Sequence, residues 1–372
     1  MDNVHLGIPV QRLVGSRTGV ARYIAELLNA WAEQEIPFQR VTVWCFRPVR
    51  IPGKFHLCVG GTRWPRVLWE HVWVARRAHR SDVDLLFCPS NIVPFMFRGA
   101  CVVTILDTLQ ARRPDDFPRV RTGYLRPLYR ASARRADRII APSETTARDI
   151  VTFYGVPRDR IVVIPLGVHA RFFEVDAAHC KDVRARYGPG GDPFVLFVGK
   201  LSRRRNIPIL IQAFARVVIR HALPHRLILI GPNYLRIPIH RMARQWGIGR
   251  RVLHYEFIPE RDLIAMYHAA DLFVYLSEWE GFGLPVLEAM AAGTPVLTLD
   301  RPVFREFVGD ATVRVDTADV EIVAAQMARI LVDRDLHRRL QQQGPVQARQ
   351  FSWTKTARRT MEVLYEVAHI TT

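Results

Sequence analysis

Cysteine is scarce in this sequence, and long apolar runs are missing. The five cysteines among 372 residues stand apart, with no CxxC pair and no repeated spacing. They are expected to be reduced thiols in a cytoplasmic protein, packed as small hydrophobic side chains, and not a disulfide framework. No apolar run approaches the ~18–20 residues that a membrane span needs. The opening residues, MDNVHLGIPV, lack the regions of a signal peptide and predict a first strand.

Metal-binding and nucleic-acid-binding motifs are also missing. The histidines are dispersed, without HExxH or a Cys/His cluster, which argues against zinc. Asp82 and Asp84 form a DxD pattern, but they precede a strand, whereas ligands of parallel sheets bind at the carboxyl ends of strands. No metal is therefore expected. No zinc finger, ribonucleoprotein motif or basic tail occurs, so no nucleic acid is expected as a partner.

Charge of one sign dominates, since 53 Lys and Arg face 35 Asp and Glu, a net charge of +18. Such a chain attracts phosphates or an anionic membrane surface. The segment 63–80, RWPRVLWEHVWVARRAHR, is basic and carries three tryptophans. It is typical either of a helix that lies on a membrane surface or of a helix that covers a sheet with a basic outer face. The second interpretation is favoured.

Short apolar runs alternate with amphipathic helical stretches along the whole chain. LLFCPS, CVVTIL and RIIAPS stand in the first half, and FVLFVG, RLILIG, DLFVYLS and TPVLTL stand in the second. This α/β alternation predicts parallel sheets covered on both faces, in two doubly wound domains. The weakest pattern lies at 173–193, which ends in GPGGDP, so we expect domains at 1–175 and 190–354.

The stretch EGFGLPVLEAM holds two glutamates, Glu280 and Glu288, around a glycine loop. Pro285 suits the first turn of a helix that Gly293 would end, so residues 281–283 form the loop before a helix N-terminus. Such a loop favours an anion, and the two carboxylates could accept hydrogen bonds from sugar hydroxyls. For either glutamate alone, a surface acid or a helix-dipole partner is the simpler interpretation.

Two further loops have a similar character. In FVGKLSRRRN, a strand ends at Gly199 and a basic loop with Lys200 and Arg205 leads into a helix, where a phosphate would bind. In VGSRTGVARYIAELL, Gly19 precedes a helix that starts near Val20. Each loop alone is weak evidence, since a solvated basic loop or a common glycine would look the same. Together they suit a ligand with a diphosphate and many hydroxyls, which is a nucleotide sugar.

These segments resemble the retaining glycosyltransferases of family 4. EGFGLPVLEAMAAGTPV is similar to the family's signature of two glutamates separated by seven residues, and VGKLSRRRNIPILIQAF is similar to its phosphate-binding segment. TGVARYIAELL, FVGDATVRVD and QFSWTKTARRTMEVLY resemble its other landmarks in the same order. The resemblance implies the GT-B fold of two facing Rossmann-like domains. It also implies that a C-terminal helix, about 355–372, crosses back onto the first domain.

The resemblance also implies roles for single residues. Glu280 would lie against the donor sugar, while Lys200 and Arg205 would neutralise the leaving diphosphate, so these three form the expected catalytic set. Glu288 would accept hydrogen bonds from the ribose. The expected donor-binding set is Gly19, Asp107, Gly199, Phe282, Gly283, Leu284 and Glu288.

The sequence departs from the family pattern in three respects. The family more often has arginine first and lysine second where this chain has Lys200 and Arg205. It usually has a histidine before the aspartate of VVTILDTL, where this chain has Leu106 beside Asp107. It often has a glycine at the position of Glu256, near the nucleotide base, so base recognition is left open.

The reaction implied is transfer of a hexose, mannose foremost, from a GDP- or UDP-linked sugar to a glycan or lipid-linked acceptor. Configuration would be retained, the leaving phosphate would act as base, and no metal or other cofactor would be needed. The protein is expected in the cytoplasm, with a peripheral contact to an anionic membrane as a further possibility. A nucleotide-sugar epimerase of the same fold and a basic nucleic-acid-binding protein stay as alternatives.

Overall fold

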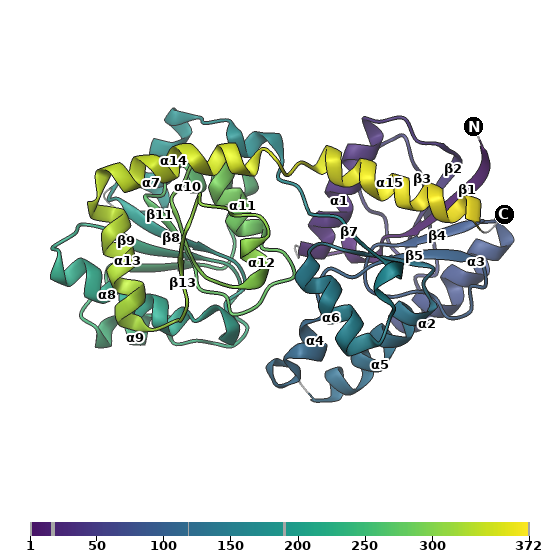
Figure 1. Cartoon of the computed structure of the whole chain (residues 1–372), viewed down its shortest axis with the longest axis horizontal. Coiled ribbons are helices and arrows are strands. Elements are labelled where there is room, and N and C mark those ends of the chain that lie inside the picture. Colours follow the sequence, from purple (N-terminus) through teal and green to yellow (C-terminus); the bar gives the residue numbers. More distant parts are fainter. Residues whose placement is uncertain (1, 16–18, 118, 189–190, 371–372) are drawn as a thin grey trace. The chain divides into compact units, whose positions relative to one another are not determined.

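The computed structural model describes residues 2–15, 19–117, 119–188 and 191–370. The chain divides into two compact units (Figure 1). Unit 1 comprises Met1–Gly167 together with Phe351–Thr372, and unit 2 comprises Val168–Gln350. Each unit contains one parallel sheet with helices around it, so each is an α/β structure of its own.

Unit 1 has a seven-stranded sheet in the order β3-β2-β1-β4-β5-β6-β7, and every recorded strand pair in it is parallel. Its strands are β1 (Asp2–Pro9), β2 (Phe38–Cys45), β3 (His56–Val59), β4 (Leu85–Cys88), β5 (Ala100–Thr104), β6 (Arg138–Ala141) and β7 (Ile161–Val163). Its helices are α1 (Gly19–Ala32), α2 (Arg66–Leu68), α3 (Val74–Arg80), α4 (Leu109–Arg112), α5 (Arg119–Arg135), α6 (Glu144–Tyr154) and α15 (Trp353–Ile370).

Unit 2 has a six-stranded sheet in the order β10-β9-β8-β11-β12-β13, also parallel in every recorded pair. Its strands are β8 (Phe194–Val198), β9 (Arg226–Ile230), β10 (Val252–Tyr255), β11 (Leu272–Tyr275), β12 (Val296–Leu299) and β13 (Val313–Val315). Its helices are α7 (Ala177–Tyr187), α8 (Ile207–Arg220), α9 (Ile239–Gln245), α10 (Glu260–Ala269), α11 (Leu284–Ala291), α12 (Pro302–Arg305), α13 (Val320–Val332) and α14 (Arg334–Ala348). Counted within the unit, this is the Rossmann strand order 3-2-1-4-5-6.

The central strands are apolar on both faces, because helices cover both sides of a parallel sheet. All five residues of β8, FVLFV, are buried, as are all four of β11, LFVY. The prediction of two doubly wound domains with parallel sheets is confirmed. Proline and glycine mark the helix ends as expected, since Pro208 and Pro285 lie in the first turns of α8 and α11, and Gly293 follows α11 with a φ of +73°.

The chain passes from unit 1 to unit 2 at Gly167, earlier than the expected linker at 173–193. That stretch contains α7, which belongs to unit 2 and lies against α10. Only Val183 of α7 is buried, so the helix lacks the apolar stripe that would reveal it in the sequence. Polar contacts hold it instead: the Asp262 carboxylate of α10 binds one histidine and two other α7 side chains. These are His179 at 3.0 Å, Arg186 at 3.0 Å and Tyr187 at 2.6 Å.

Helix α15 belongs to unit 1 although it follows unit 2 in the sequence. It lies beside α1, and the Trp31 Nε1 of α1 donates a hydrogen bond to the Ala357 carbonyl at 2.9 Å (Figure 1). The Thr356 hydroxyl donates to the Pro165 carbonyl at 2.8 Å, next to the point where the chain leaves the unit. The C-terminal helix α15 therefore completes the fold of unit 1.

The tryptophan-rich segment 63–80 is part of the fold of unit 1. It forms α2, a π-helical turn (η2, Trp69–Trp73) and α3. Trp69 is fully buried and stacks on Trp73 with ring centroids 5.3 Å apart, while Trp64 is 37% exposed. Across the described parts of the chain, no helix combines the length and the hydrophobicity of a membrane span.

The two chain segments that connect the units, at Gly167 and at Ser352–Trp353, lie in close contact within unit 1. A Cβ added at Gly167 would lie 2.1 Å from the Trp353 nitrogen and 2.2 Å from the Ser352 carbonyl carbon. Gly167→Ala should therefore displace the start of α15 and lower the unfolding free energy by about 1–3 kcal/mol. Urea denaturation would measure the change. Gly53→Ala is the control, because a Cβ there meets nothing within 4 Å, and equal stability of the two variants would contradict the prediction.

Candidate active site

The candidate site of unit 2 lies at the carboxyl ends of β8 and β11. These neighbouring strands are where the strand order reverses, and ligands of doubly wound sheets bind at such points. Gly199 and Lys200 directly follow β8, and the loop from Leu276 to Gly283 follows β11. The segment after β8 includes the 3-10 turn η6 (Arg203–Arg205), which leads into α8.

Glu280 is the centre of this site. Its Oε1 accepts hydrogen bonds from Arg204 Nη2 and Arg205 Nε, both at 3.1 Å. The hydroxyls of Tyr275 and Ser277 donate to the same oxygen at 2.9 and 2.8 Å. Oε2 accepts one hydrogen bond from the described side chains, from Arg204 Nη2 at 3.1 Å. Oε1 is thus fully occupied, while Oε2 keeps room for a ligand hydroxyl.

The surroundings keep Glu280 ionised. Burial by itself would raise the pKa of the carboxyl group, but the charges of Arg204 and Arg205 and the hydrogen bonds from Ser277 and Tyr275 outweigh it and lower the pKa to about 2. Burial raises the pKa of Tyr275, and the Glu280 charge adds to the rise, so the phenol stays a proton donor. The site therefore holds an ionised carboxylate at neutral pH.

Arg205 is a buried ion-pair partner and not a loosely held loop cation. Its Nη1 donates to the Lys200 carbonyl at 2.8 Å, and its guanidinium lies over the Tyr275 ring at 5.2 Å. The absence of a side chain at Gly199 makes room for it, because a Cβ there would lie 2.5 Å from Arg205 Nη1. Gly199 belongs to the expected donor-binding set, and in this structure its missing side chain leaves the space that Arg205 fills.

Lys200 lies differently from Arg205, although the sequence suggested one shared role. The Lys200 side chain is exposed, and its Nζ lies 4.9 Å from the centre of the Tyr234 ring. Tyr234 is itself 72% exposed. Of the two predicted phosphate-binding cations, one is thus held by Glu280 and the other is presented at the surface.

Sequence reasoning missed three residues that hold Glu280. Arg204 binds both carboxylate oxygens and also donates from Nε to the Trp279 carbonyl at 3.0 Å. Tyr275 and Ser277 donate their hydroxyl groups. A signal existed, since three consecutive arginines precede the helix and both hydroxyl residues stand within five positions of Glu280. The spacing alone does not say which arginine turns toward the carboxylate.

Glu288 occupies a separate, more buried place. It lies in the second turn of α11, is 3% exposed, and accepts a hydrogen bond from the Tyr267 hydroxyl of α10 at 2.8 Å. The loop before α11 is ordered by the Phe282 ring, which stacks on Phe307 at 4.7 Å, and Gly283 has a φ of +117°. Of the predicted pair of acids, Glu280 thus binds two arginines of the loop after β8, and Glu288 binds Tyr267 of α10.

The predicted residues of unit 1 lie at its own strand ends and helix start. Gly19 is the first residue of α1 and is exposed, whereas positions 16–18 of the glycine loop lie outside the described residues. The Asp107 carboxylate follows β5 and accepts a hydrogen bond from the Leu109 amide at 3.0 Å, which starts α4. Leu106 beside it is partly buried.

The DxD pattern has a structural role before β4. The Asp84 carboxylate accepts a hydrogen bond from the His5 amide at 2.8 Å, which ties β1 to the start of β4. Asp82 is in the left-handed region, with a φ of +48°. Both therefore stand at the amino end of the strand, as the sequence indicated.

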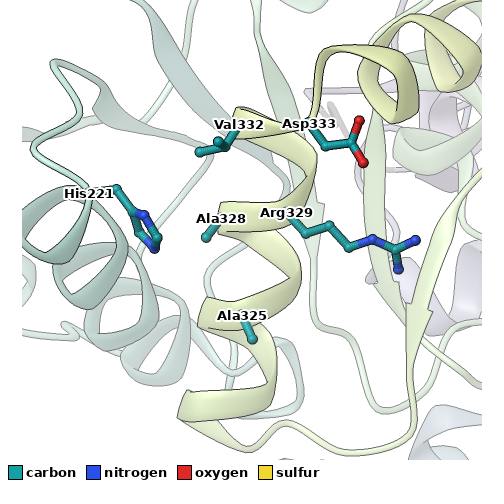
Figure 2. Close-up of a pocket in the computed structure, with 6 residues that line it drawn as sticks. All are labelled: His221, Ala325, Ala328, Arg329, Val332 and Asp333. Atoms are coloured by element: carbon teal, nitrogen blue, oxygen red, sulfur yellow. The ribbon is translucent and has the colours of Figure 1, made fainter.

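A surface hollow of about 460 Å³ lies elsewhere in unit 2 (Figure 2). His221, at the end of α8, faces α13 across it, and the side chains of Ala325 and Ala328 contribute little but methyl groups. Because α8 begins beside the Glu280 site, its far end is roughly 20 Å away at 1.5 Å per residue. The hollow is therefore separate from the candidate site.

Comparison with known sequences gives two family matches that together span most of the chain. Residues 17–172 match the family described as "Glycosyltransferase Family 4", and residues 181–347 match "Glycosyl transferases group 1". The chain is 32% identical over 278 residues to the O-antigen chain mannosyltransferase B of Escherichia coli, covering 73% of this chain and 72% of that protein. This chain belongs to the family 4 glycosyltransferases. It is therefore an enzyme that transfers sugars.

Other family 4 relatives differ in length and in name. The chain is 29% identical to a serotype-specific mannosyltransferase WbdA of Escherichia coli over 76% of this chain, yet the match spans only 35% of that protein. It is 35% identical to a D-inositol 3-phosphate glycosyltransferase of Nocardia farcinica over 61% of this chain and 52% of that protein. The chain thus spans about a third to a half of the length of these two relatives.

Solved structures agree on the fold of this family 4 glycosyltransferase. Anabaena HepE in complex with UDP-glucose superimposes with a TM-score of 0.79 at 19% identity, covering 98% of this chain and 100% of that one. WaaG, a glycosyltransferase involved in lipopolysaccharide biosynthesis, gives a TM-score of 0.75 at 17% identity, covering 97% and 99%. These neighbours establish the GT-B fold expected from the sequence.

The Glu280 network predicts a pH-dependent contribution to stability. Because folding lowers the pKa of Glu280 from 4.5 to about 2, ionised Glu280 favours the folded state by about 3 kcal/mol near neutral pH. This contribution is present above the ordinary pKa and is lost as the pH falls through the lowered one. Glu280→Gln should therefore lower the unfolding free energy near neutral pH, and its deficit against the wild type should shrink as the pH drops from 4.5 toward 2.

Urea unfolding over this pH range would measure the deficit. Glu306→Gln serves as the control, because Glu306 is an exposed carboxylate of the same unit. A deficit that stays constant with pH would show that the stability of the network does not depend on the Glu280 charge.

Proposed function

We propose that this glycosyltransferase moves a hexose, with mannose as the first candidate, from a nucleoside-diphosphate sugar to a glycan or lipid-linked acceptor. The observation that carries the proposal is the Glu280 carboxylate, held ionised by two arginines at the switch point of unit 2. Relatives named as mannosyltransferases support mannose and a role in polysaccharide biosynthesis. The family membership favours sugar transfer over the epimerase and nucleic-acid-binding alternatives.

Glu280 Oε2 would accept a hydrogen bond from a hydroxyl of the donor sugar. Oε1 already accepts four hydrogen bonds, so the carboxylate cannot rotate freely and would hold the sugar in one orientation. The two arginine charges and the hydrogen bonds lower the basicity of the carboxylate, which makes Glu280 a weak nucleophile. The geometry therefore supports a role in positioning the donor sugar, in line with the place that the family resemblance implied for Glu280.

Lys200 and Arg205 would stabilise the negative charge that grows on the leaving diphosphate, and the start of α11 at Gly283 and Leu284 would add its helix dipole. In the proposed step the bond from sugar C1 to the phosphate oxygen breaks, and a bond from C1 to the acceptor oxygen forms on the same face. The acceptor proton passes to the leaving diphosphate, so the configuration at C1 is retained. Glu288 would bind the ribose, and no metal or other cofactor is required.

The proposal also covers the nucleotide base of the donor and the cellular location of the enzyme. GDP is the first candidate because of the mannosyl relatives, while a solved structure with UDP-glucose makes UDP the second. The cysteine usage supports a cytoplasmic location as part of the proposal. A peripheral contact with anionic lipid would involve the exposed residues Trp64, Arg66, Val67 and Leu68.

Titration of the protein with GDP, UDP and ADP would identify the nucleotide base. If none of the three nucleotides bound, the assignment of this site as a donor-binding active site would be wrong.

Glu280→Gln should separate transfer from nucleotide binding. Loss of the charged acceptor should misplace the donor sugar and reduce kcat by at least about 100-fold. GDP affinity should not fall, because Arg204 and Arg205 lose the carboxylate that neutralises them. Radiolabelled GDP-mannose assays and GDP titration calorimetry would measure the two effects. Full transfer activity in this variant would remove the role given to Glu280.

Lys200→Ala tests the phosphate site without disturbing the Glu280 network. The Lys200 side chain is exposed, so its truncation should leave stability nearly unchanged. Loss of one charged contact to the diphosphate should weaken GDP binding about 10- to 100-fold. Arg203→Ala is the matched control, since Arg203 is an exposed cation on the same loop. Equal effects of the two changes would mean that only net charge matters.

A further inference from the structure

Unit 1 carries a second polar cluster at the switch point of its own sheet. The strand order reverses between β1 and β4, which are neighbours. Gln11 lies just after β1, and Asn91 lies just after β4, where its amide donates to the carbonyl of Thr104 at the end of β5. Asn91 has a φ of +64°, in the left-handed region that asparagine adopts more readily than most other residues with a side chain.

A π-helical turn places Glu70 against Gln11. The turn is fixed by Trp69, whose Nε1 donates to the Gly60 carbonyl at 2.8 Å and whose ring stacks on Trp73. The extra residue of a π turn weakens a helix, and such turns often mark functional sites. Here it accompanies burial of Glu70, which is 6% exposed, and the Gln11 side-chain amide donates to Glu70 Oε1.

The cluster has hydrogen-bonding capacity that the protein does not use. Gln11 is 2% exposed, and its Oε1 has no partner among the described residues. The same holds for the buried Oδ1 of Asn91. Glu70 offers a second oxygen to which no described residue donates a recorded hydrogen bond. These are acceptors, so the group that would satisfy them must bring O–H or N–H donors.

Two cations and an aromatic side chain lie near Glu70. Burial raises the pKa of Glu70, opposed by the charges of Arg12 and Arg66 and by the hydrogen bond from Gln11. Arg66 is exposed, and Tyr124, whose pKa is raised by burial and by the Glu70 charge, is 45% exposed. Hydroxyl groups both donate and accept, so a sugar would match the acceptors and the guanidinium donors together, and a phosphate would match only the guanidinium groups.

We propose that Gln11 and Glu70 bind the hydroxyl groups of the terminal sugar of the acceptor glycan, with Arg12 and Arg66 at the edge of this subsite. The inference rests on the proposed glycosyl transfer and assigns a place in unit 1 to the second substrate. Glu70 touches the acceptor sugar and not the diphosphate, so its loss should affect only the acceptor.

Two volume-conserving variants test the subsite. Glu70→Gln removes the charge, and Gln11→Met removes the amide. With octyl α-mannoside as acceptor and GDP-mannose as donor, each should raise the KM for the mannoside about 10- to 100-fold. The KM for GDP-mannose, the affinity for GDP, and donor hydrolysis without acceptor should be unchanged. Arg76→Gln is the control on the same helical segment, because Arg76 is exposed, and it should behave as the wild type.

A binding measurement without turnover separates this inference from the proposed function. Saturation-transfer NMR should detect octyl α-mannoside on the wild type and not on the two variants, whether or not transfer occurs. An unchanged mannoside KM in both folded variants, or failure of the wild type to bind the mannoside, would overturn the subsite. A fall in GDP affinity and thermal stability in both variants, in proportion to the rise in KM, would also overturn it by showing a purely structural cluster.

Discussion

The buried carboxylate of Glu280 is the constraint on which the site of unit 2 depends. A charge removed from water must be paired and hydrogen-bonded, and Glu280 meets this need through residues of two separate loops. Arg204 and Arg205 come from the loop after β8, while Tyr275 and Ser277 come from β11 and its end. The same contacts that keep the charge stable thus hold both strand ends in one arrangement, and α11 starts from the loop so positioned.

The exchange of lysine and arginine relative to the family pattern conserves charge but not geometry. Arg205 uses one nitrogen for Glu280 and another for the Lys200 carbonyl, and its flat guanidinium lies on Tyr275. A lysine ammonium at that position is a single point and could not make these three contacts together. The more flexible cation, Lys200, stands instead at the exposed edge. The buried cation is therefore the one that pairs with the Glu280 carboxylate, and the exposed cation is Lys200.

The fold was predictable from the sequence to a greater extent than the site. Parallel sheets follow from apolar runs such as those of β8 and β11, and Pro208, Pro285 and Gly293 mark helix ends by their backbone chemistry. Helix α7 was not predicted from the sequence. Polar contacts to Asp262 hold it in place, and such contacts give no periodic pattern of apolar residues. The hydrogen bonds of Arg204 to Glu280 were not predicted, because tertiary contacts decide in which direction each side chain of a run of arginines points. The burial of Glu288 against Tyr267 was hidden for the same reason.

The return of the chain to unit 1 has a consequence for how the protein comes to be folded. Unit 2 is one continuous stretch, but unit 1 is closed by α15, whose residues are synthesised only after all of unit 2. On the ribosome the downstream unit can therefore be complete while the upstream one still exposes the apolar surface that α15 covers, including the neighbourhood of Trp31. The usual order of assembly, in which the N-terminal part finishes first, is therefore inverted, because unit 1 can be completed only after α15 has been synthesised.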